Sequence, residues 1–364
     1  MFEFRLPSLG ADMDAGKLLE WTVKPGDAVR KGQVVAVVDT AKAAIDVEIW
    51  QDGTVFELLV EPGERIPVGT VLATLLEPGE QPGELRPRPP GRARISPAAR
   101  KRAEALGVDA ARLKGSGAGG AVTLADVEAA AAPRPAAPEA GRDRQAAMRG
   151  VIAAAMSRAK REIPHYYLLE TIPMARAQRW LAQANEGRPI ERRLLMAVLQ
   201  IKAVALALAE YPELNGHFRD GRFVPGAAAH VGVAIALRGG GLVAPALHDA
   251  GAKSLDQLMG ELADLVRRTR AGTLRSSEIA DPTVTLTNLG DEGVEAVMGV
   301  IYPPQVALVG FGRVALRPWV EDGALLALPT VVASLAADHR VSDGHRGALF
   351  LAELRERLQH PEEL

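Results

Sequence analysis

The strongest constraint on the fold is a pair of similar segments near the N-terminus. Residues 23–36 read Val-Lys-Pro-Gly-Asp-Ala-Val-Arg-Lys-Gly-Gln-Val-Val-Ala, and residues 60–73 read Val-Glu-Pro-Gly-Glu-Arg-Ile-Pro-Val-Gly-Thr-Val-Leu-Ala. Each copy has a Pro-Gly turn, a second glycine turn and a run of alternating β-formers. The repeat therefore predicts two similar β units, related by a quasi-twofold axis, within one small domain.

A lysine, Lys42, lies between the two copies. The flanking runs Val34–Val38 and Ile45–Ile49 are predicted to be strands, and the six residues that join them place Lys42 at or near the tip of a hairpin. An amine at such a tip is accessible to a modifying enzyme. The alternative is a solvated turn lysine with no special role.

The segment resembles the lipoyl domain, whose modified lysine follows an acidic residue, a threonine and one further residue. Asp39, Thr40, Lys42 and Ala43 match that setting, whereas Ala41 stands where the family usually has a polar residue. Relatives that carry biotin have Met-Lys-Met, so the alanines on either side of Lys42 favour lipoate over biotin. The resemblance implies that Lys42 carries lipoic acid in amide linkage.

Composition excludes several classes of protein. A chain of 364 residues suggests two or three domains. A net charge of -2 gives no signal for nucleic acid or membrane binding, and the absence of cysteine excludes disulfides, thiolate metal sites and a cysteine nucleophile. No uncharged apolar run approaches about 18 residues, so neither a membrane span nor a secretory signal is expected, and the cytoplasm is the expected location.

Two stretches rich in proline, at 78–92 and 131–146, are predicted to be linkers. Between them, Ser96 and Pro97 are typical of a helix start and Gly107 of its end, while a glycine-rich loop at 115–120 precedes a second short helix. Domain boundaries follow at 1–77, 93–130 and 147–364.

The segment 93–130 resembles a peripheral-subunit-binding domain, whose signature begins Ser-Pro-x-x-Arg and continues with Gly-x-Asp and a glycine-rich loop. Arg100 and Lys101 supply positive charge suited to an acidic protein partner. The alternative is that both are solvated helix charges. The family usually has a basic residue after the loop glycines, where this chain has Ala121.

The remaining sequence predicts an α/β domain with a mixed sheet flanked by helices. Helical periodicity covers 148–161, 194–210, 254–270 and 344–359, and strand patterns cover 230–237, 283–288, 306–316 and 331–337. The last strand runs into Asp338-His339-Arg340-Val341-Ser342-Asp343-Gly344, a strand end followed by a glycine turn. Such a turn can hold an imidazole rigidly, which makes His339 the candidate general base, although a lone histidine is more often structural.

With this domain order, the chain resembles the dihydrolipoamide acyltransferase core component of 2-oxo acid dehydrogenase complexes over nearly its whole length. The matching segments are 163–167, 207–215, 241–245 and 285–290. The resemblance implies a fold like chloramphenicol acetyltransferase and a homotrimer with active sites between subunits. His339 would come from one chain and Thr287 from its neighbour.

Each candidate residue suits acyl transfer. A neutral imidazole at His339 can take the proton of an attacking thiol, and the hydroxyl of Thr287 can stabilise the oxyanion that then forms. Asp343 has two interpretations. It could orient the imidazole of His339, or it could pair with an arginine and so stabilise the loop, and the resemblance to the family favours the second. His165 is interpreted as structural.

The implied activity is transfer of an acyl group from the lipoyl arm to coenzyme A, with acetyl as the first choice. Acidic residues at 291, 292 and 295 disfavour a succinyl group. Branched-chain or succinyl transfer and a catalytically silent scaffold are the alternatives, and the presence of both His339 and Thr287 argues against the scaffold. The implied partners are a thiamine-dependent 2-oxo acid decarboxylase and dihydrolipoamide dehydrogenase. Assembly of trimers into cages of 24 or 60 chains is a further alternative, but the acidic residues at 360–364 favour an assembly that stops at the trimer.

Overall fold

A computed structural model of the chain describes residues 1–7, 13, 15–40, 44–77, 80, 103, 127, 140–237, 241–321 and 323–364, with the backbone alone for 140–147. The chain divides into two compact units, residues 1–80 with 144–364, and residues 81–143. Within 81–139 the described residues are Ala103 and Val127, which are buried and helical. The rest of the small helical domain predicted at 93–130 lies outside the described residues.

The N-terminal domain consists of two four-stranded sheets. One has the order β1 (Phe2–Arg5), β8 (Val71–Leu76), β6 (Gly53–Leu58) and β3 (Ala28–Val29); the other has the order β5 (Ala44–Glu48), β4 (Val34–Asp39), β2 (Ala15–Trp21) and β7 (Arg65–Pro67). Each strand of one sheet has its counterpart at the same place in the other, so the predicted quasi-twofold relation is confirmed.

The turn glycines show why the repeat is visible in the sequence. Gly26 and Gly63 have φ of 95° and 97°, and Gly32 and Gly69 have φ of 83° and 85°. Only glycine adopts these left-handed angles at low cost, so both copies need it at the same two places. Alternate residues of the strands fill a core between the sheets, in which Leu18, Val38, Val47 and Leu72 are fully buried: a common apolar centre for both halves.

The predicted hairpin around Lys42 is confirmed. β4 and β5 pair antiparallel, and Asp39 lies opposite Ala44, so the connection is 40–43. Lys42 itself lies outside the described residues.

The C-terminal domain is a mixed α/β layer structure. Its main sheet has the order β15 (Ala246–Leu247), β12 (Val231–Val233), β17 (Val284–Asn288), β18 (Ala307–Phe311), β20 (Ala324–Asp338) and β19 (Ala315–Glu321), and β9 (His165–Pro173) also pairs with β20. Two small hairpins accompany it: β10 (Gly216–Arg219) with β11 (Arg222–Pro225), and β13 (Ile235–Ala236) with β14 (Leu242–Val243). The predicted α/β class is confirmed.

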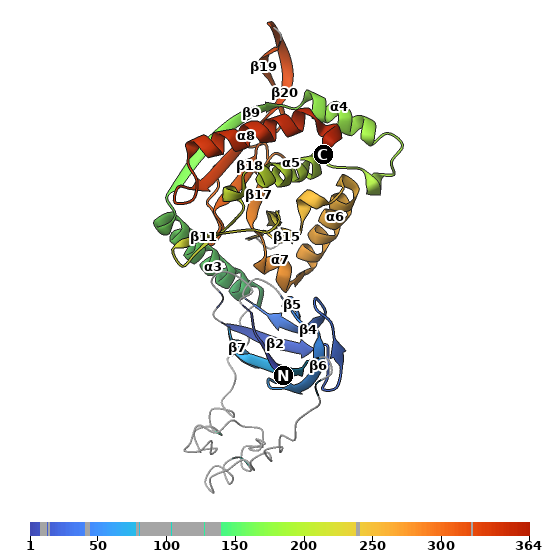
Figure 1. Ribbon diagram of the computed structural model, residues 1–364, viewed down its shortest axis with the longest axis vertical. Helices are drawn as coiled ribbons and strands as arrows, with labels where there is room; N and C mark the ends of the chain where they lie inside the picture. The colour runs from blue at the N-terminus through green and yellow to red at the C-terminus, as the bar shows by residue number, and fades with distance from the viewer. Residues whose placement is uncertain are drawn as a thin grey trace. The chain divides into compact units, whose positions relative to one another are not determined.

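Helices cover the sheet. They are α3 (Ala140–Glu162), α4 (Ala175–Ala184), α5 (Met196–Glu210), α6 (Leu255–Ala271), α7 (Ser276–Ala280) and α8 (Gly344–Gln359), with short 3-10 turns at Ile190–Arg192, Pro212–Leu214, Ala250–Ala252 and Pro361–Glu363. Figure 1 shows α8 lying along the sheet and α5 beside it. Val198 to Leu208 are almost all buried, which explains why α5 is apolar on every side.

The two faces of the sheet have separate packing partners. Val309 and Leu335 belong to the main core with α5 and α8, whereas their neighbours Leu308 and Ala336 pack on the other face against Ala159 of α3. This alternation follows from the period of two along a strand. The central strands are therefore buried on both sides and form a rigid support for the residues at their ends.

Three predicted elements differ from the structure. The strand predicted at 230–237 divides into β12, in the main sheet, and β13, in a separate hairpin with β14. The strand predicted at 306–316 breaks at Gly312, where a Cβ atom would lie 2.0 Å from the carbonyl oxygen of Glu295. The chain continues as β19, which forms a two-stranded ribbon with the first half of β20 that projects from the sheet (Figure 1). In addition, α3 begins at Ala140, inside the linker predicted at 131–146, so the helical region starts seven residues before the predicted boundary at 147.

Candidate active site

An ion pair between a buried carboxylate and an arginine fixes the turn that carries His339. Asp338, the last residue of β20, is completely buried, and both of its oxygens accept hydrogen bonds from the Arg340 guanidinium at 2.6–3.1 Å. The Arg340 guanidinium also lies 4.0 Å above the ring of Phe218. Because a buried carboxylate without a partner is costly, this pair holds the turn in one conformation.

His339 itself is exposed, and its ring packs against the side chain of Tyr166. Its backbone N–H donates to the carbonyl oxygen of Pro164 at 3.0 Å, which fixes the main chain. Its ring packs edge-on to Tyr166, with centroids 5.4 Å apart. The Tyr166 hydroxyl forms a 2.8 Å hydrogen bond with the hydroxyl of Ser342, and burial raises the pKa of this tyrosine. The imidazole is thus supported from behind and open at its tip.

Asp343 caps a helix. Its carboxylate accepts a 3.0 Å hydrogen bond from the backbone N–H of Arg346, the pattern of an N-cap at the start of α8. That hydrogen bond, with smaller contributions from nearby histidines, lowers the pKa of Asp343. The predicted brace between Asp343 and an arginine side chain is therefore not what the structure shows: Arg340 pairs with Asp338, and the Arg346 guanidinium pairs with Glu213.

Thr287 lies near the end of β17. Because β17 and β20 run in opposite directions, this end of the sheet is opposite to the one that carries His339. It is half-buried, and its hydroxyl makes no hydrogen bond to any residue within the described part of the chain. The next residue, Asn288, is anchored on both sides of its amide: it donates to buried Gln200 at 2.8 Å and accepts from the backbone N–H of Gly290 at 2.8 Å. The strand end is thus held in place on both sides of Asn288.

Thr287 and His339 of one chain cannot act on the same group. Strand register aligns Thr287 with Gly310 of β18, and Gly310 with Ser334 of β20. His339 follows Ser334 by five residues, or about 16 Å along the strand, and two strand spacings add about 10 Å, so the two Cα atoms are about 19 Å apart. A site that uses both side chains therefore needs two chains.

His165 has both ring nitrogens occupied. Nδ1–H donates to the carbonyl oxygen of Ile163 at 2.9 Å, and Nε2 accepts from the backbone N–H of Ile301 at 3.1 Å. Burial is the main cause of its lowered pKa. A neutral imidazole that bridges two backbone segments has no free nitrogen for proton transfer, which supports the structural interpretation of His165.

A mostly apolar cavity of about 620 Å³ lies elsewhere, between α3, α7 and the loop that ends at Gln305. Ile152, Met156, Asp281 and Tyr302 are among its lining residues, whereas neither His339 nor Thr287 lines it. The cavity is therefore separate from both candidate catalytic side chains.

Three predicted site residues fall outside the described residues: Lys42, Arg100 and Lys101. Conversely, sequence reasoning missed Tyr166, Ser342 and the Asp338–Arg340 pair, which together support His339. Among the residues that the structure describes, no group of three or more His, Cys, Asp or Glu side chains could hold a metal ion. The helices within the same ranges include none long and apolar enough to cross a membrane.

Three family models match the chain. The model described as "2-oxoacid dehydrogenases acyltransferase (catalytic domain)" matches residues 139–364, the biotin/lipoyl model, described as "biotin-requiring enzyme", matches 2–75, and the E3-binding domain model matches 93–128.

Curated relatives are similar over almost the full length. The dihydrolipoyllysine-residue acetyltransferase components of pyruvate dehydrogenase complexes from Zymomonas mobilis and Staphylococcus aureus are 29% and 30% identical, over 99% of this chain and 98% of theirs. The corresponding component of the acetoin cleaving system of Bacillus subtilis is 29% identical, over 98% of this chain and 97% of its own.

Solved structures agree with these relatives. A probable dihydrolipoamide acetyltransferase from Listeria monocytogenes matches with a TM-score of 0.55 and 28% identity, over 58% of this chain and 91% of that one. A truncated catalytic core of the 2-oxoacid dehydrogenase multienzyme complex from Thermoplasma acidophilum matches with a TM-score of 0.53 and 26% identity, over 58% and 95%. The chain belongs to the family of 2-oxoacid dehydrogenase acyltransferases.

Proposed function

We propose that this protein transfers an acetyl group between a lipoyl group on Lys42 and coenzyme A, within a 2-oxo acid dehydrogenase complex. One observation carries the proposal: an exposed histidine on a rigid turn, in an acyltransferase domain that shares its chain with a lipoyl-type domain. The curated relatives from both pyruvate and acetoin systems are named acetyltransferases, which favours acetyl over the branched-chain and succinyl alternatives.

The residues around Lys42 fit a lipoyl group. β4 and β5 pair antiparallel as far as Asp39 and Ala44, so Lys42 belongs to the connection 40–43 between these two strands. Alanines flank Lys42 where biotin-carrying domains have methionines. When bound, a lipoyl group supplies the thiol that carries the acyl group as a thioester.

The proposed chemistry uses His339 as general base. As a thiol sulfur forms its bond to the carbonyl carbon of an acyl thioester, its proton passes to the neutral imidazole of His339. When the tetrahedral intermediate collapses, the bond to the departing sulfur breaks and the imidazolium returns the proton to that sulfur. The edge-on contact with Tyr166 and the braced turn keep the ring in place through both steps.

Thr287 is proposed as the oxyanion donor. Its hydroxyl lacks a partner among the described residues and stands on a strand whose end is fixed by Asn288 and Gln200. A preorganised donor of this kind interacts most strongly when the carbonyl oxygen becomes negative, so it lowers the barrier more than it strengthens substrate binding.

The separation of about 19 Å between the two Cα atoms supports an active site shared by two chains, and a closed homotrimer satisfies this at every interface. The β19–β20 ribbon supports association as well. Strand register places Leu316, Val320 and Leu325 on one face of it, and they are 72%, 67% and 74% exposed. Exposed apolar faces of this kind are typical of association surfaces.

The match to the E3-binding domain supports binding to other enzymes of such a complex. We infer that these are a thiamine-dependent 2-oxo acid decarboxylase and dihydrolipoamide dehydrogenase, and that Arg100 and Lys101 contact an acidic surface on one of them.

Complementation between two inactive variants tests the shared site. His339→Ala and Thr287→Ala, each alone, are expected to lose most acetyl transfer from acetyl-coenzyme A to dihydrolipoamide. When both are co-expressed in one assembly, a site with Thr287 from one variant and His339 from the other is intact, so about a quarter of the activity should return in randomly mixed trimers. Separately purified variants mixed without subunit exchange are the control. No recovery in verified mixed trimers would contradict the proposal.

A further inference from the structure

β5 is the edge strand of its sheet within the lipoyl-type domain, and a strand of the acyltransferase domain pairs with it. β16 (Thr273–Arg275) pairs parallel with β5, with Thr273 opposite Ala44, Leu274 opposite Ile45 and Arg275 opposite Asp46. Without β16, β5 is the outermost strand of its sheet, because the order continues only toward β4. Edge strands present unpaired backbone N–H and C=O groups, which an added strand can satisfy.

Each of the two paired strands is anchored in its own domain. Ile45 is buried in the core between the two N-terminal sheets, whereas Leu274 is buried in the main core of the acyltransferase domain. The pairing therefore joins two separate apolar cores, and β5 is the strand with which β16 pairs.

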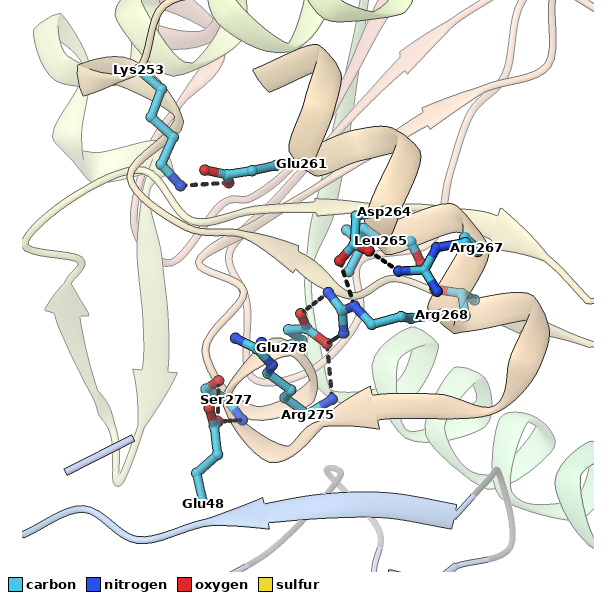
Figure 2. A network of polar contacts seen from close by, with 11 residues as sticks. Glu48, Lys253, Glu261, Asp264, Leu265, Arg267, Arg268, Arg275, Ser277 and Glu278 are labelled. Atoms are coloured by element: carbon cyan, nitrogen blue, oxygen red, sulfur yellow. Dashed lines mark hydrogen bonds and ion pairs between the residues drawn. The ribbon is translucent and has the colours of Figure 1, made fainter. Parts of the chain in front are cut away.

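Side chains add specific contacts beyond the backbone. A carboxylate oxygen of Glu48 accepts hydrogen bonds from the hydroxyl of Ser277 at 2.5 Å and from its backbone N–H at 3.3 Å. The backbone N–H of Glu48 donates to the Ser276 hydroxyl at 3.1 Å. Figure 2 shows Glu48 pointing from β5 toward Ser277 at the start of α7. Ile279 of α7 packs against the apolar core of the N-terminal domain.

The acyltransferase side of the contact is rigid. The Glu278 carboxylate accepts from the Arg268 guanidinium at 2.6 Å and from the backbone N–H of Arg275 at 2.8 Å, and Arg268 also binds Asp264 at 2.6 Å (Figure 2). This network fixes the corner between α6, β16 and α7. Positive charge at Arg275 and Arg268 faces Asp46, whose pKa is raised by burial and lowered in part by these arginines.

We propose that β16 and the first turn of α7 form a docking site for the lipoyl domain of the same chain, which holds that domain by strand addition to β5 between visits to other active sites. The occupant is specified by the Glu48 contacts with Ser276 and Ser277 and by the packing of Ile279. Docking fixes Ala44, two residues after Lys42, so the domain must undock before its hairpin can travel freely. The inference does not depend on which acyl group is transferred.

The absence of native cysteines allows a direct test on the full chain. Paired residues of neighbouring strands have Cα atoms within disulfide range, so Ala44→Cys with Thr273→Cys should form a disulfide under mild oxidation. The matched control is Ala44→Cys with Glu356→Cys, which places the second cysteine on the exposed side of α8. Because docking raises the local concentration of the two thiols above that of a free tether, the first pair should react at least about tenfold faster.

A second pair of variants tests the side-chain contacts. In the Ala44→Cys/Thr273→Cys background, Glu48→Arg should slow disulfide formation to the rate of the control pair. Glu20→Arg, the same charge change at an exposed position of β2, two strands away from β5 in the same sheet, should leave it unchanged. Circular dichroism verifies folding of each variant. Equal rates for both cysteine pairs, or disulfides formed mainly between chains on a non-reducing gel, would overturn docking within one chain.

Discussion

The hydroxyl of Tyr166 lies 2.8 Å from the hydroxyl of Ser342, so the beginning of strand β9 holds the loop that carries His339. The same tyrosine presents its ring to the imidazole. Gly347 makes room for this arrangement, because a Cβ atom there would lie 2.9 Å from the Tyr166 hydroxyl. Tyr166 and Ser342 are therefore positioning residues for His339.

Tyr166→Phe and Ser342→Ala are each expected to lower kcat for acetyl transfer about fivefold, because each loses one hydrogen bond worth about 1 kcal/mol. KM should change little, and the double variant should be no slower than either single one, since both remove the same bond. Steady-state kinetics with acetyl-coenzyme A and dihydrolipoamide provide the measurement. Tyr167→Phe, whose hydroxyl bonds to Lys160 instead, is the control. Additive losses, or a rise in KM alone, would contradict the assignment.

A second prediction separates the two interpretations of Asp343. An asparagine still accepts the Arg346 N–H bond, so Asp343→Asn should keep kcat within about twofold. Asp343→Ala loses the cap, at a cost of about 1 kcal/mol, which lowers the Tm of a domain of this size by about 2–4 °C. Calorimetry and kinetics on both variants decide the matter. A loss of kcat of about a hundredfold or more in Asp343→Asn would assign it the orienting role instead.

The sequence contained the signal for the cap. Asp343 stands directly before Gly344, the first residue of a helix that the periodicity predicted over 344–359 and that the structure confirms. An aspartate at that place is a preferred N-cap. The Asp338–Arg340 pair could not be predicted in the same way. Its importance follows from the complete burial of Asp338, which the sequence does not reveal.

Local patterns predicted local elements and missed those defined by distant contacts. The turn glycines and alternating strands of the N-terminal domain sufficed for its symmetry. β9 was missed because six consecutive residues, Tyr166 to Thr171, are only partly buried or exposed and show no clean alternation. The break at Gly312 depends on the approach of Glu295, 17 residues away. The β5–β16 pairing joins segments more than 200 residues apart, beyond any periodicity argument.

The third prediction is that Lys42 is lipoylated in protein isolated from its native host. Lys42 belongs to the connection between β4 and β5, where the sequence predicts an amine accessible to a modifying enzyme. Mass spectrometry of proteolytic peptides should find one lipoyl group on Lys42 and none on Lys31, an exposed turn lysine of the same domain. Lys42→Arg should remove the modification without changing the fold. Unmodified or biotinylated Lys42 in nearly all molecules would contradict it.

The last prediction concerns pH. His165 titrates near 6.5 in an unfolded chain, but burial lowers its pKa in the folded domain, with Lys160 acting in the same direction. As pH falls below about 6.5, the unfolded state binds the proton first, so the stability contributed by neutral His165 is present above that pH and is lost as pH falls through the lower folded pKa.

His165→Gln removes this proton uptake. At pH 8 the variant should be less stable by about 1 kcal/mol, because the amide atoms of glutamine do not take the positions of the two ring nitrogens and one hydrogen bond, to Ile163 or from Ile301, is lost. Between pH 8 and pH 5.5 its Tm should fall less steeply than that of the unmodified protein, so the two curves converge at low pH. Calorimetric melting of the acyltransferase transition measures both slopes. His345→Gln, a substitution at an exposed position of α8, is the matched control. Parallel curves for His165→Gln and the unmodified protein would show that protonation of His165 does not limit stability.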